Sequence, residues 1–592
     1  GDYVPPKVAI ATRGSNLFLV GNRIRREFFH RWTRSPLRIV PGMEMPAFER
    51  PVPGVLDGHI ETQMAAIWAA INDPRFDAPT DSAVVEQLLV VDPDSAPRIV
   101  RDVFTVSEAN GGGSTARAFA VGFPNAHGVL IDADSMAVRS WTYGEFARQR
   151  TQGKSWFWDL AGADVATGWT SAPEIRLQQT SADRVLEPVA LQGRSARLHS
   201  YRTTGDAIEL TYDLTFPTPG KGDDAEERTV SVTETLQAIP KTADGRTGWR
   251  RQIALTGFGE LLPVFQTDNV QGVLGSPQIR VGGSDVIGRN GGDVPSVPFQ
   301  VNTADGTASL TVDYMAGLTG RPLPVKPRPE RPRNEATVTT ARGFVGERLN
   351  LPADIMPTAF AWNAAGELVF TSLKGHVYIA RDTDDDGIED ELVLFEEGLA
   401  VPFGVIADGD ALLVAHKPEL IRLRDTDGDG RADERTVVAD GWGYTDDYHD
   451  WTTGPVRDSE GNLYVAVGSD YAQKKRTSPL TRWRGTVLRI APDGTVEPIA
   501  RGMRYPIGIA ADAEGRLFVS DQQGVANTFN EVNHVVPGRF YGVAARDDQD
   551  PPEETRPAVQ IPHPWTRSVN GLAFLPEDLE GPWAPFAGHG VG

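Results

Sequence analysis

The sequence predicts a mainly β protein with a small helical N-terminal segment, a β-sandwich-like middle region and an incomplete β-propeller at the C-terminus. Three observations predict this class. The 61 Gly and 44 Pro residues make about 18% of the chain, against about 12% on average, which indicates many turns between short strands. In the middle of the chain, apolar residues alternate with polar ones. The last two-fifths of the chain repeats a strand–turn–strand pattern.

The composition excludes several classes of protein. A chain of 592 residues is too long for one core, so we expect three domains, the outer two of them incomplete. The net charge of −22 argues against a nucleic-acid partner or an anionic membrane surface. The absence of cysteine excludes disulfides, thiol catalysis, Cys-zinc sites, iron–sulfur clusters and covalent c-type haem on this chain. No run of 18 apolar residues occurs, so no membrane span is expected.

The first domain, residues 1–80, is predicted to be helical. Residues 22–32 and 61–71 each place apolar side chains at the spacing of one helix face, and Asp73-Pro74 ends the second helix.

The middle region, residues 85–320, changes to a period of two. The segment 208–216 alternates strictly between apolar and polar side chains, which predicts a half-buried antiparallel strand of a sandwich. Residues 85–165 are open to interpretation as a separate subdomain. The tryptophans of this region either stack on sugar or fill the core: Trp141, Trp156 and Trp158. Residues 321–345 begin with RPLPVKPRPERPR and are expected to form an extended linker.

The region from residue 346 to residue 592 repeats a short apolar strand, a polar turn and a second strand. Equivalent points of the repeats lie 45 to 63 residues apart, at Ala359, Gly404, Gly454, Gly508 and Gly571. This period is typical of propeller blades. We expect about five visible blades of six, with the last one cut short, since a propeller must close to cover its strand edges.

Two acidic loops lie inside these repeats, RDTDDDGIEDE at 381–391 and RDTDGDGRADE at 424–434. Each follows the pattern D-x-D-x-D-G-x-x-D, and clustered carboxylates on a glycine turn suit Ca²⁺. Neither is an EF-hand, because Val393 and Thr436 occupy the position of the final glutamate. The alternative is a solvated acidic turn. The candidate ligands are Asp382, Asp384, Asp386, Asp390, Asp425, Asp427, Asp429 and Asp433.

A histidine and an arginine occupy matching positions before two consecutive blade strands. His449 lies in the run DDYHD, and Arg504 lies in RGMRYPIGIA. A histidine between acids is ordinarily a surface residue. Here both side chains precede a blade strand, where propeller loops line the central channel, so we expect them to face one pocket.

The blocks YHDWTTGPVRDSEGNLYVAVGSD, RGTVLRIAPDG, RGMRYPIGIA and DQQG…NEVN…PGRFYG follow in that order over residues 448–542. Together they resemble the six-bladed soluble quinoprotein glucose dehydrogenases and their sorbosone-dehydrogenase relatives. The resemblance covers roughly residues 350–592.

This resemblance implies a pyrroloquinoline quinone (PQQ) cofactor with Ca²⁺ over the channel. It makes His449 the general base for the substrate hydroxyl and Arg504 the group that polarises the accepting quinone oxygen. Tyr505 stands where the family usually has Asn, and Gln523-Gly524 would lie near the cofactor's metal. It also implies a small sugar or alcohol substrate, an electron acceptor such as a cytochrome, and a periplasmic or secreted location.

The segment RWTRSPLRIVPGMEMPAF at 31–48, with the helix after it, resembles the second half of a c-type cytochrome domain. There, Met45 would be the axial haem ligand. No CxxCH occurs, so haem c is expected only if a longer parent protein carries that motif upstream. The alternative is that Met43 and Met45 pack a small helical domain.

The two resemblances therefore imply a PQQ-dependent sugar or alcohol dehydrogenase-like protein that passes electrons to a cytochrome module. The first alternative is a non-catalytic, calcium-stabilised propeller and sandwich that binds carbohydrate or protein. The second is a metal-dependent lactonase-type propeller, which needs an inward set of Glu, Asn and Asp ligands that the sequence does not supply in a recognisable pattern.

Overall fold

A computed structural model of the chain divides into two compact units, Gly1–Val85 and Glu86–Gly592, and each is described by itself. No helix in the described part of the chain is both long enough and apolar enough to cross a membrane. The structure describes residues 20–39, 47–52, 54–73, 88–152, 155–179, 184–190, 194–218, 227–285, 296–318, 340, 346, 348–349, 351–352, 355–445, 450–469, 482–522, 529–544, 550–566, 568–575 and 590–591.

The first unit is helical, as predicted. Its small core joins Phe29 of one helix to Met64 and Ile71 of another. The helix predicted over 61–71 is observed as α5, and it ends directly before Asp73-Pro74 because proline cannot continue a helix. The helices are α2 (Val20–Arg23), α3 (Arg26–Arg34), α4 (Pro36–Ile39), the 3-10 turn η2 (Leu56–Gly58) and α5 (Ile60–Asn72).

The middle region of the second unit packs two large antiparallel sheets around one core. The six-stranded sheet contributes Phe119 and Val129 to this core, and the long sheet contributes Leu210 and Trp249. The six-stranded sheet has the order β16 (Gln271–Gly272), β8 (Ala163–Thr167), β5 (Ala137–Tyr143), β4 (His127–Asp132), β3 (Ser114–Gly122), β2 (Arg98–Thr105).

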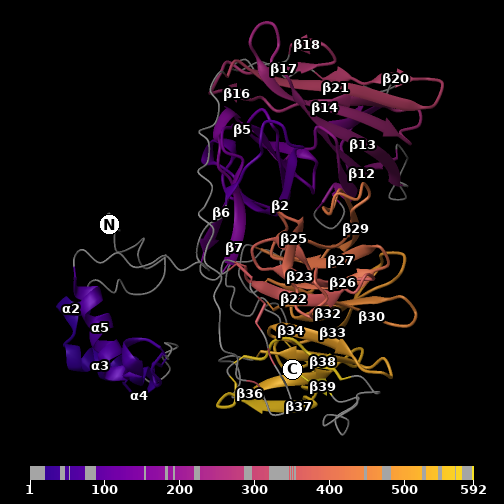
Figure 1. Cartoon of the computed structure of the whole chain (residues 1–592). Coiled ribbons are helices and arrows are strands. Elements are labelled where there is room, and N and C mark those ends of the chain that lie inside the picture. Colours follow the sequence, from indigo (N-terminus) through magenta and orange to yellow (C-terminus); the bar gives the residue numbers. More distant parts are fainter. Residues whose placement is uncertain are drawn as a thin grey trace. The chain divides into compact units, whose positions relative to one another are not determined.

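The long sheet contains twelve strands and passes from the sandwich into the propeller (Figure 1). In order its strands are β18 (Ser284–Asp285), β17 (Gln278–Val281), β21 (Thr307–Ala316), β14 (Thr247–Thr256), β13 (Glu227–Ile239), β12 (Ala207–Pro217), β11 (Ala196–Thr204), β29 (Glu434–Asp440), β28 (Glu419–Arg424), β27 (Ala411–His416) and β26 (Gly404–Asp408), while β20 (Gln300–Asn302) pairs with β21 beside this path.

The alternation predicted over 208–216 is confirmed in β12. The apolar side chains of this strand are buried against the six-stranded sheet, and their polar neighbours are partly exposed. Trp141, Trp156 and Trp158 are all buried, so they fill the core rather than offer a face to sugar. Two smaller sheets complete the region: β1 (Leu88–Leu89), β6 (Ala147–Gln152), β7 (Ser155–Leu160); and β10 (Arg184–Leu186), β9 (Ile175–Gln179), β15 (Leu262–Phe265), β19 (Val297–Pro298). A 3-10 turn, η4 (Glu108–Asn110), follows β2.

The C-terminal part consists of repeated four-stranded antiparallel sheets, which confirms the mainly β, propeller-like class. Four blades are present in the described residues, and a two-stranded sheet follows them. Blade 1 is β22 (Pro357–Trp362), β23 (Leu368–Ser372), β24 (His376–Arg381), β25 (Glu391–Glu396); blade 2 is β26 to β29; blade 3 is β30 (Thr452–Arg457), β31 (Leu463–Val467), β32 (Thr486–Ile490), β33 (Val496–Arg501); blade 4 is β34 (Pro506–Ala511), β35 (Leu517–Asp521), β36 (Phe529–His534), β37 (Val559–Pro562); the last pair is β38 (Ala573–Phe574) and β39 (Gly590–Val591).

The first strand of each blade contacts the first strand of the next, from β22 through β26, β30 and β34 to β38. Glycines make this approach close. A Cβ atom at Gly404 would lie 1.4 Å from the carbonyl oxygen of Gly454. Hydroxyl groups bridge the same junctions: Thr358 donates to the carbonyl of Pro402, and Thr453 donates to that of Pro506. The repeated glycines of the sequence therefore mark the contacts between blades.

The outermost strand of blade 2 does not present a free edge to solvent. Its last strand, β29, pairs with β11 of the sandwich at Ser200–Arg202. A buried ion pair reinforces this junction, because Arg435 of β29 binds Glu396 at 2.6 Å and packs its guanidinium over the ring of Tyr201. The pairing satisfies the backbone groups of an edge that would otherwise attract another strand.

Candidate functional site

Strand order divides the loops of the propeller between two ends of the blades. In a four-stranded meander, the connection from one blade to the next lies at the same end as the loop between the second and third strands. Arg504 lies in the connection from β33 to β34, and the segment 441–451 connects β29 to β30. Both therefore lie at one end of the blades, which we name the Arg504 end. The loops between the third and fourth strands lie at the opposite end, the acidic-loop end.

Asp521 clamps the backbone at Arg504 and Tyr505. It ends β35, is fully buried, and accepts the backbone N–H groups of Arg504 at 2.9 Å and Tyr505 at 2.7 Å. Burial raises the pKa of Asp521 to about 6, while the two backbone N–H groups favour its charged form. The Arg504 guanidinium donates to the carbonyl of Gln522 at 3.0 Å and lies 4.4 Å from the centre of the Tyr505 ring.

A second buried acid holds the connection that contains His449. Asp450 accepts the backbone N–H and the hydroxyl of Thr445, both at 2.6 Å, and pairs with Arg484 at 3.3 Å. Arg484 also donates to the carbonyl of Gly443 at 2.9 Å. The two flanks of the segment 446–449 are thus tied to each other. A buried charge that is paired and hydrogen-bonded in this way is costly to disturb.

The structure places some of the predicted site residues and leaves others outside its described part. Arg504 and Tyr505 are brought together at the start of β34. The residues that lie outside the described part are His449, Gln523, Gly524 and Met45.

Sequence reasoning gave no role to Asp450, Asp521 or Arg484. In the sequence, Asp450 and Asp521 each lie beside the end of an apolar strand segment. A charged residue at such a position is usually expected to be exposed to solvent, but both are buried.

The two acidic loops lie at the acidic-loop end, away from Arg504. In the first loop, carboxylate oxygens of Asp382, Asp384 and Asp386 lie within 4.8 Å of one another, and the second loop brings three together in the same way: Asp425, Asp427 and Asp429. Gly387 and Gly430 both have φ of +88°, a left-handed conformation that glycine adopts at low cost. Among the described residues, these are the groups of three or more acidic or histidine side chains that could hold a metal ion.

The remaining aspartate of each motif closes its loop instead of joining the cluster. Asp390 accepts the backbone N–H of Thr383 at 3.0 Å and its hydroxyl at 2.8 Å, and Asp433 does the same for Thr426. In the first cluster, the negative charge of Asp386 raises the pKa of Asp384. A divalent cation would relieve this repulsion, since hard oxygen ligands are what Ca²⁺ prefers.

We expect calcium to stabilise the chain through these loops. At a calcium concentration ten times the dissociation constant, each loop that binds should add about 1.4 kcal/mol to the free energy of unfolding. Urea unfolding in CaCl₂ and in EDTA measures this difference. The double variant Asp384→Asn, Asp427→Asn should lose the response. The variant Asp385→Asn, which removes one charge of the first loop from outside its cluster, should keep it. A stability that neither calcium nor EDTA moves would contradict a bound ion.

The family model described as Domain of unknown function (DUF7133) matches residues 356–566, which contain blades 1 to 4. No curated protein matches the chain.

Solved structures with similarity to this chain include sugar dehydrogenases. A candidate oxidoreductase (glucose dehydrogenase) from Thermus thermophilus is 22% identical over 37% of this chain and 73% of its own, with a TM-score of 0.29. The PQQ-bound aldose sugar dehydrogenase from Streptomyces coelicolor is 17% identical over 37% and 72%, with a TM-score of 0.31. The holo PQQ domain of pyranose dehydrogenase from Coprinopsis cinerea is 14% identical over 35% and 59%, with a TM-score of 0.27.

Proposed function

We propose that the propeller oxidises a small sugar or alcohol with PQQ as electron acceptor, at the Arg504 end of the blades. The observation that carries the proposal is the Asp521 clamp, which fixes Arg504 at the start of β34. The neighbouring innermost strand, β30, is the one that His449 precedes. The proposal includes a cytochrome-like electron acceptor and a periplasmic or secreted location.

The chain's own residues have distinct roles in this proposal. His449 takes the proton of the substrate hydroxyl as a general base. Arg504 would stabilise negative charge on the accepting oxygen of bound PQQ, and the Asp521 clamp holds the backbone at Arg504 in place. Bound PQQ supplies a two-electron acceptor for the hydride of the substrate. Gln523 and Gly524 would lie near the calcium ion of the cofactor.

The described side chains at the Arg504 end include types that bind an anionic, planar group such as PQQ. Arg501 and Arg504 bring guanidinium groups to this end, whereas Arg484 is fully buried and paired with Asp450, and the buried ring of Tyr505 lies against the Arg504 guanidinium. The carboxylate of Asp521 is covered by two backbone N–H groups, so it does not present its charge to a ligand. Guanidinium groups are the residues of choice for binding carboxylates.

Reconstitution of the whole chain with PQQ and Ca²⁺ tests this function. We expect reduction of a dye acceptor with sugars or alcohols, and a loss of at least about 100-fold in kcat/KM for His449→Ala, since a general base contributes that much. The variant Arg504→Gln should also weaken PQQ binding in a titration without substrate.

The matched control is Arg516→Gln. Arg516 lies in the turn between β34 and β35, at the acidic-loop end, and pairs with the exposed acid Glu514. The variant Arg516→Gln should leave PQQ binding and dye reduction unchanged. A chain that neither binds PQQ nor reduces dye would refute the dehydrogenase.

One observation favours a non-catalytic alternative, in which the calcium-stabilised propeller and sandwich bind carbohydrate or protein. The Arg504 guanidinium already has a hydrogen-bond partner and an aromatic neighbour within its own loop, and the residue is only 9% exposed. A purely structural arginine would show the same contacts. Tight PQQ binding that depends on Arg504 would exclude this alternative.

A further inference from the structure

The segment 441–445 follows β29 at the Arg504 end of the blades, and it ends four residues before His449 in the chain. It belongs to no helix or strand, yet Trp442, Gly443 and Tyr444 are buried. Buried backbone outside regular secondary structure needs other partners for its N–H and C=O groups. The partners of this segment therefore show what fixes it in place.

Two of these partners belong to the middle region, and both lie in β3 of the six-stranded sheet. The Tyr444 hydroxyl donates to the carbonyl of Ala116 at 2.7 Å, and the Arg117 guanidinium donates to the carbonyl of Trp442 at 3.0 Å. The Arg117 guanidinium also lies 5.9 Å from the centre of the Tyr444 ring. Burial raises the pKa of Tyr444 well above its usual value, so its hydroxyl keeps the proton that it donates.

The propeller holds the same segment through its own side chains. Lys417, in the loop between β27 and β28, donates to the carbonyl of Thr445 at 3.1 Å. Arg484, at the start of β32, donates to the carbonyl of Gly443 at 2.9 Å. Each of the residues 442–445 is therefore hydrogen-bonded to a partner outside the segment.

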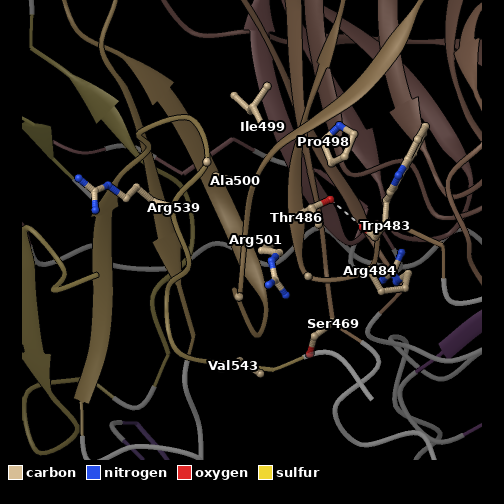
Figure 2. Close-up of a pocket in the computed structure, with 13 residues that line it drawn as sticks. Ser469, Trp483, Arg484, Thr486, Pro498, Ile499, Ala500, Arg501, Arg539 and Val543 are labelled. Carbon is tan, nitrogen blue, oxygen red and sulfur yellow. Dashed lines mark hydrogen bonds between the residues drawn. The ribbon is translucent and has the colours of Figure 1, made fainter. Parts of the chain in front are cut away.

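The segment 441–445 is also connected to the Arg504 loop. A cavity of about 330 Å³ adjoins that loop, and Figure 2 shows Arg484 and Ser469 among its lining side chains. Arg484 binds the segment at Gly443, and the backbone N–H of Ser469 donates to the carbonyl of Arg504 at 2.7 Å. The walls of one cavity thus join the segment before His449 to the loop that carries Arg504.

We propose that the middle region is a positioning element of the proposed active site, in which Tyr444 and Arg117 fix the segment 441–445 and thereby set the position of His449. This inference rests on the proposed function and gives the middle region a role in it. Both side chains act through the segment, so they are positioning residues. A general base must lie within hydrogen-bond reach of the proton that it takes, and a displacement of about 1 Å can cost about 100-fold in rate.

Steady-state kinetics of Tyr444→Phe, in the whole chain reconstituted with PQQ and Ca²⁺, tests this role. The substrate is the sugar or alcohol that the wild-type chain oxidises fastest in the dye assay. We expect kcat to fall at least about 10-fold, while KM and the dissociation constant of PQQ change less than about twofold, because the base is misplaced and the Arg504 loop is not. Hydrogen exchange of the peptide 441–450, measured by mass spectrometry, should be faster in the variant.

The matched control is Tyr212→Phe. Tyr212 is also buried, lies in β12 of the middle region and donates its hydroxyl to Glu234 at 2.9 Å. Its variant loses one buried hydrogen bond away from the segment 441–445, so kcat and the exchange of the peptide should match the wild type. Arg117→Met removes the other contact from the middle region and should repeat the effect of Tyr444→Phe.

A kcat in Tyr444→Phe equal to that of an active wild-type chain would overturn the positioning role and leave the proposed function standing. An equal loss of kcat in Tyr212→Phe would also overturn it, since a loss of stability would then explain both variants. A wild-type chain that neither binds PQQ nor reduces dye would refute the proposed function, and the positioning role with it. Circular dichroism of each variant confirms that it is folded before its kinetics are interpreted.

Discussion

The variant Arg251→Met is expected to lower the free energy of unfolding by about 3–5 kcal/mol, the usual cost of removing one partner from a buried ion pair. Arg251 lies in β14 and is fully buried. It binds Glu174 at 2.6 Å and Glu234 at 2.6 Å, and donates to the carbonyl of Met136. Without the guanidinium, two carboxylates share the core with no opposite charge. Urea unfolding followed by tryptophan fluorescence measures the change.

The neighbouring residue provides the control. Arg250 pairs with Asp313 at 2.6 Å on the other face of β14, where the arginine side chain is 39% exposed. Arg250→Met should cost less than about 1 kcal/mol, because exposed ion pairs are screened by water. Burial raises the pKa of Glu174 to about 7, so adding Glu174→Gln to Arg251→Met should recover part of the loss. Equal effects of the two arginine variants would show that the buried network does not stabilise the fold.

The variant Gly404→Ala is expected to destabilise the contact between blades 2 and 3 by about 3 kcal/mol, at the upper range for overpacking. The new Cβ atom would lie 1.4 Å from the carbonyl oxygen of Gly454 and 2.9 Å from its nitrogen, so backbone would have to move. The φ angle of Gly404 is not in the left-handed region, so conformational strain does not add to the effect. The same urea unfolding experiment measures it.

Gly571→Ala is the matched control. Gly571 occupies the equivalent point of the fifth repeat, and no atom lies within 4 Å of a Cβ placed there. Its substitution should change the free energy of unfolding by less than about 1 kcal/mol, since it mainly restricts the unfolded chain. If Gly404→Ala were as mild, the close approach of neighbouring innermost strands would not be a stabilising feature of the propeller.

Local patterns predicted the helices and strands well because an element with one buried face has apolar residues at a regular spacing in the sequence. The alternation in β12 and the helical spacing in α5 each follow from one buried face, and that face is visible in consecutive residues. The blade repeats were visible for the same reason, since each blade buries the same strands against its neighbours. Gly404 and Gly508, where neighbouring strands approach closely, also recur at equivalent points of the repeats.

The candidate site was only partly predictable. Arg504 and Tyr505 were found because they lie in a motif, but the Asp521 clamp was not, because it joins residues 16 and 17 positions apart through a turn of the blade. The Asp450–Arg484 pair joins residues 34 apart. A charged residue in a sequence suggests a surface position, and only its distant partner shows that it is buried.

By itself, the sequence determined the order of helical, sandwich-like and propeller segments, because apolar period and turn residues are local properties of the chain. It also determined the pattern of the two acidic loops. The folded structure is needed to show that β11 extends the sheet of blade 2 through β29, and that Arg251 binds the carboxylates of Glu174 and Glu234. It also shows that a cavity of about 330 Å³ adjoins the Arg504 loop. These features depend on pairing between residues far apart in the chain, and periodicity carries no information about such pairs.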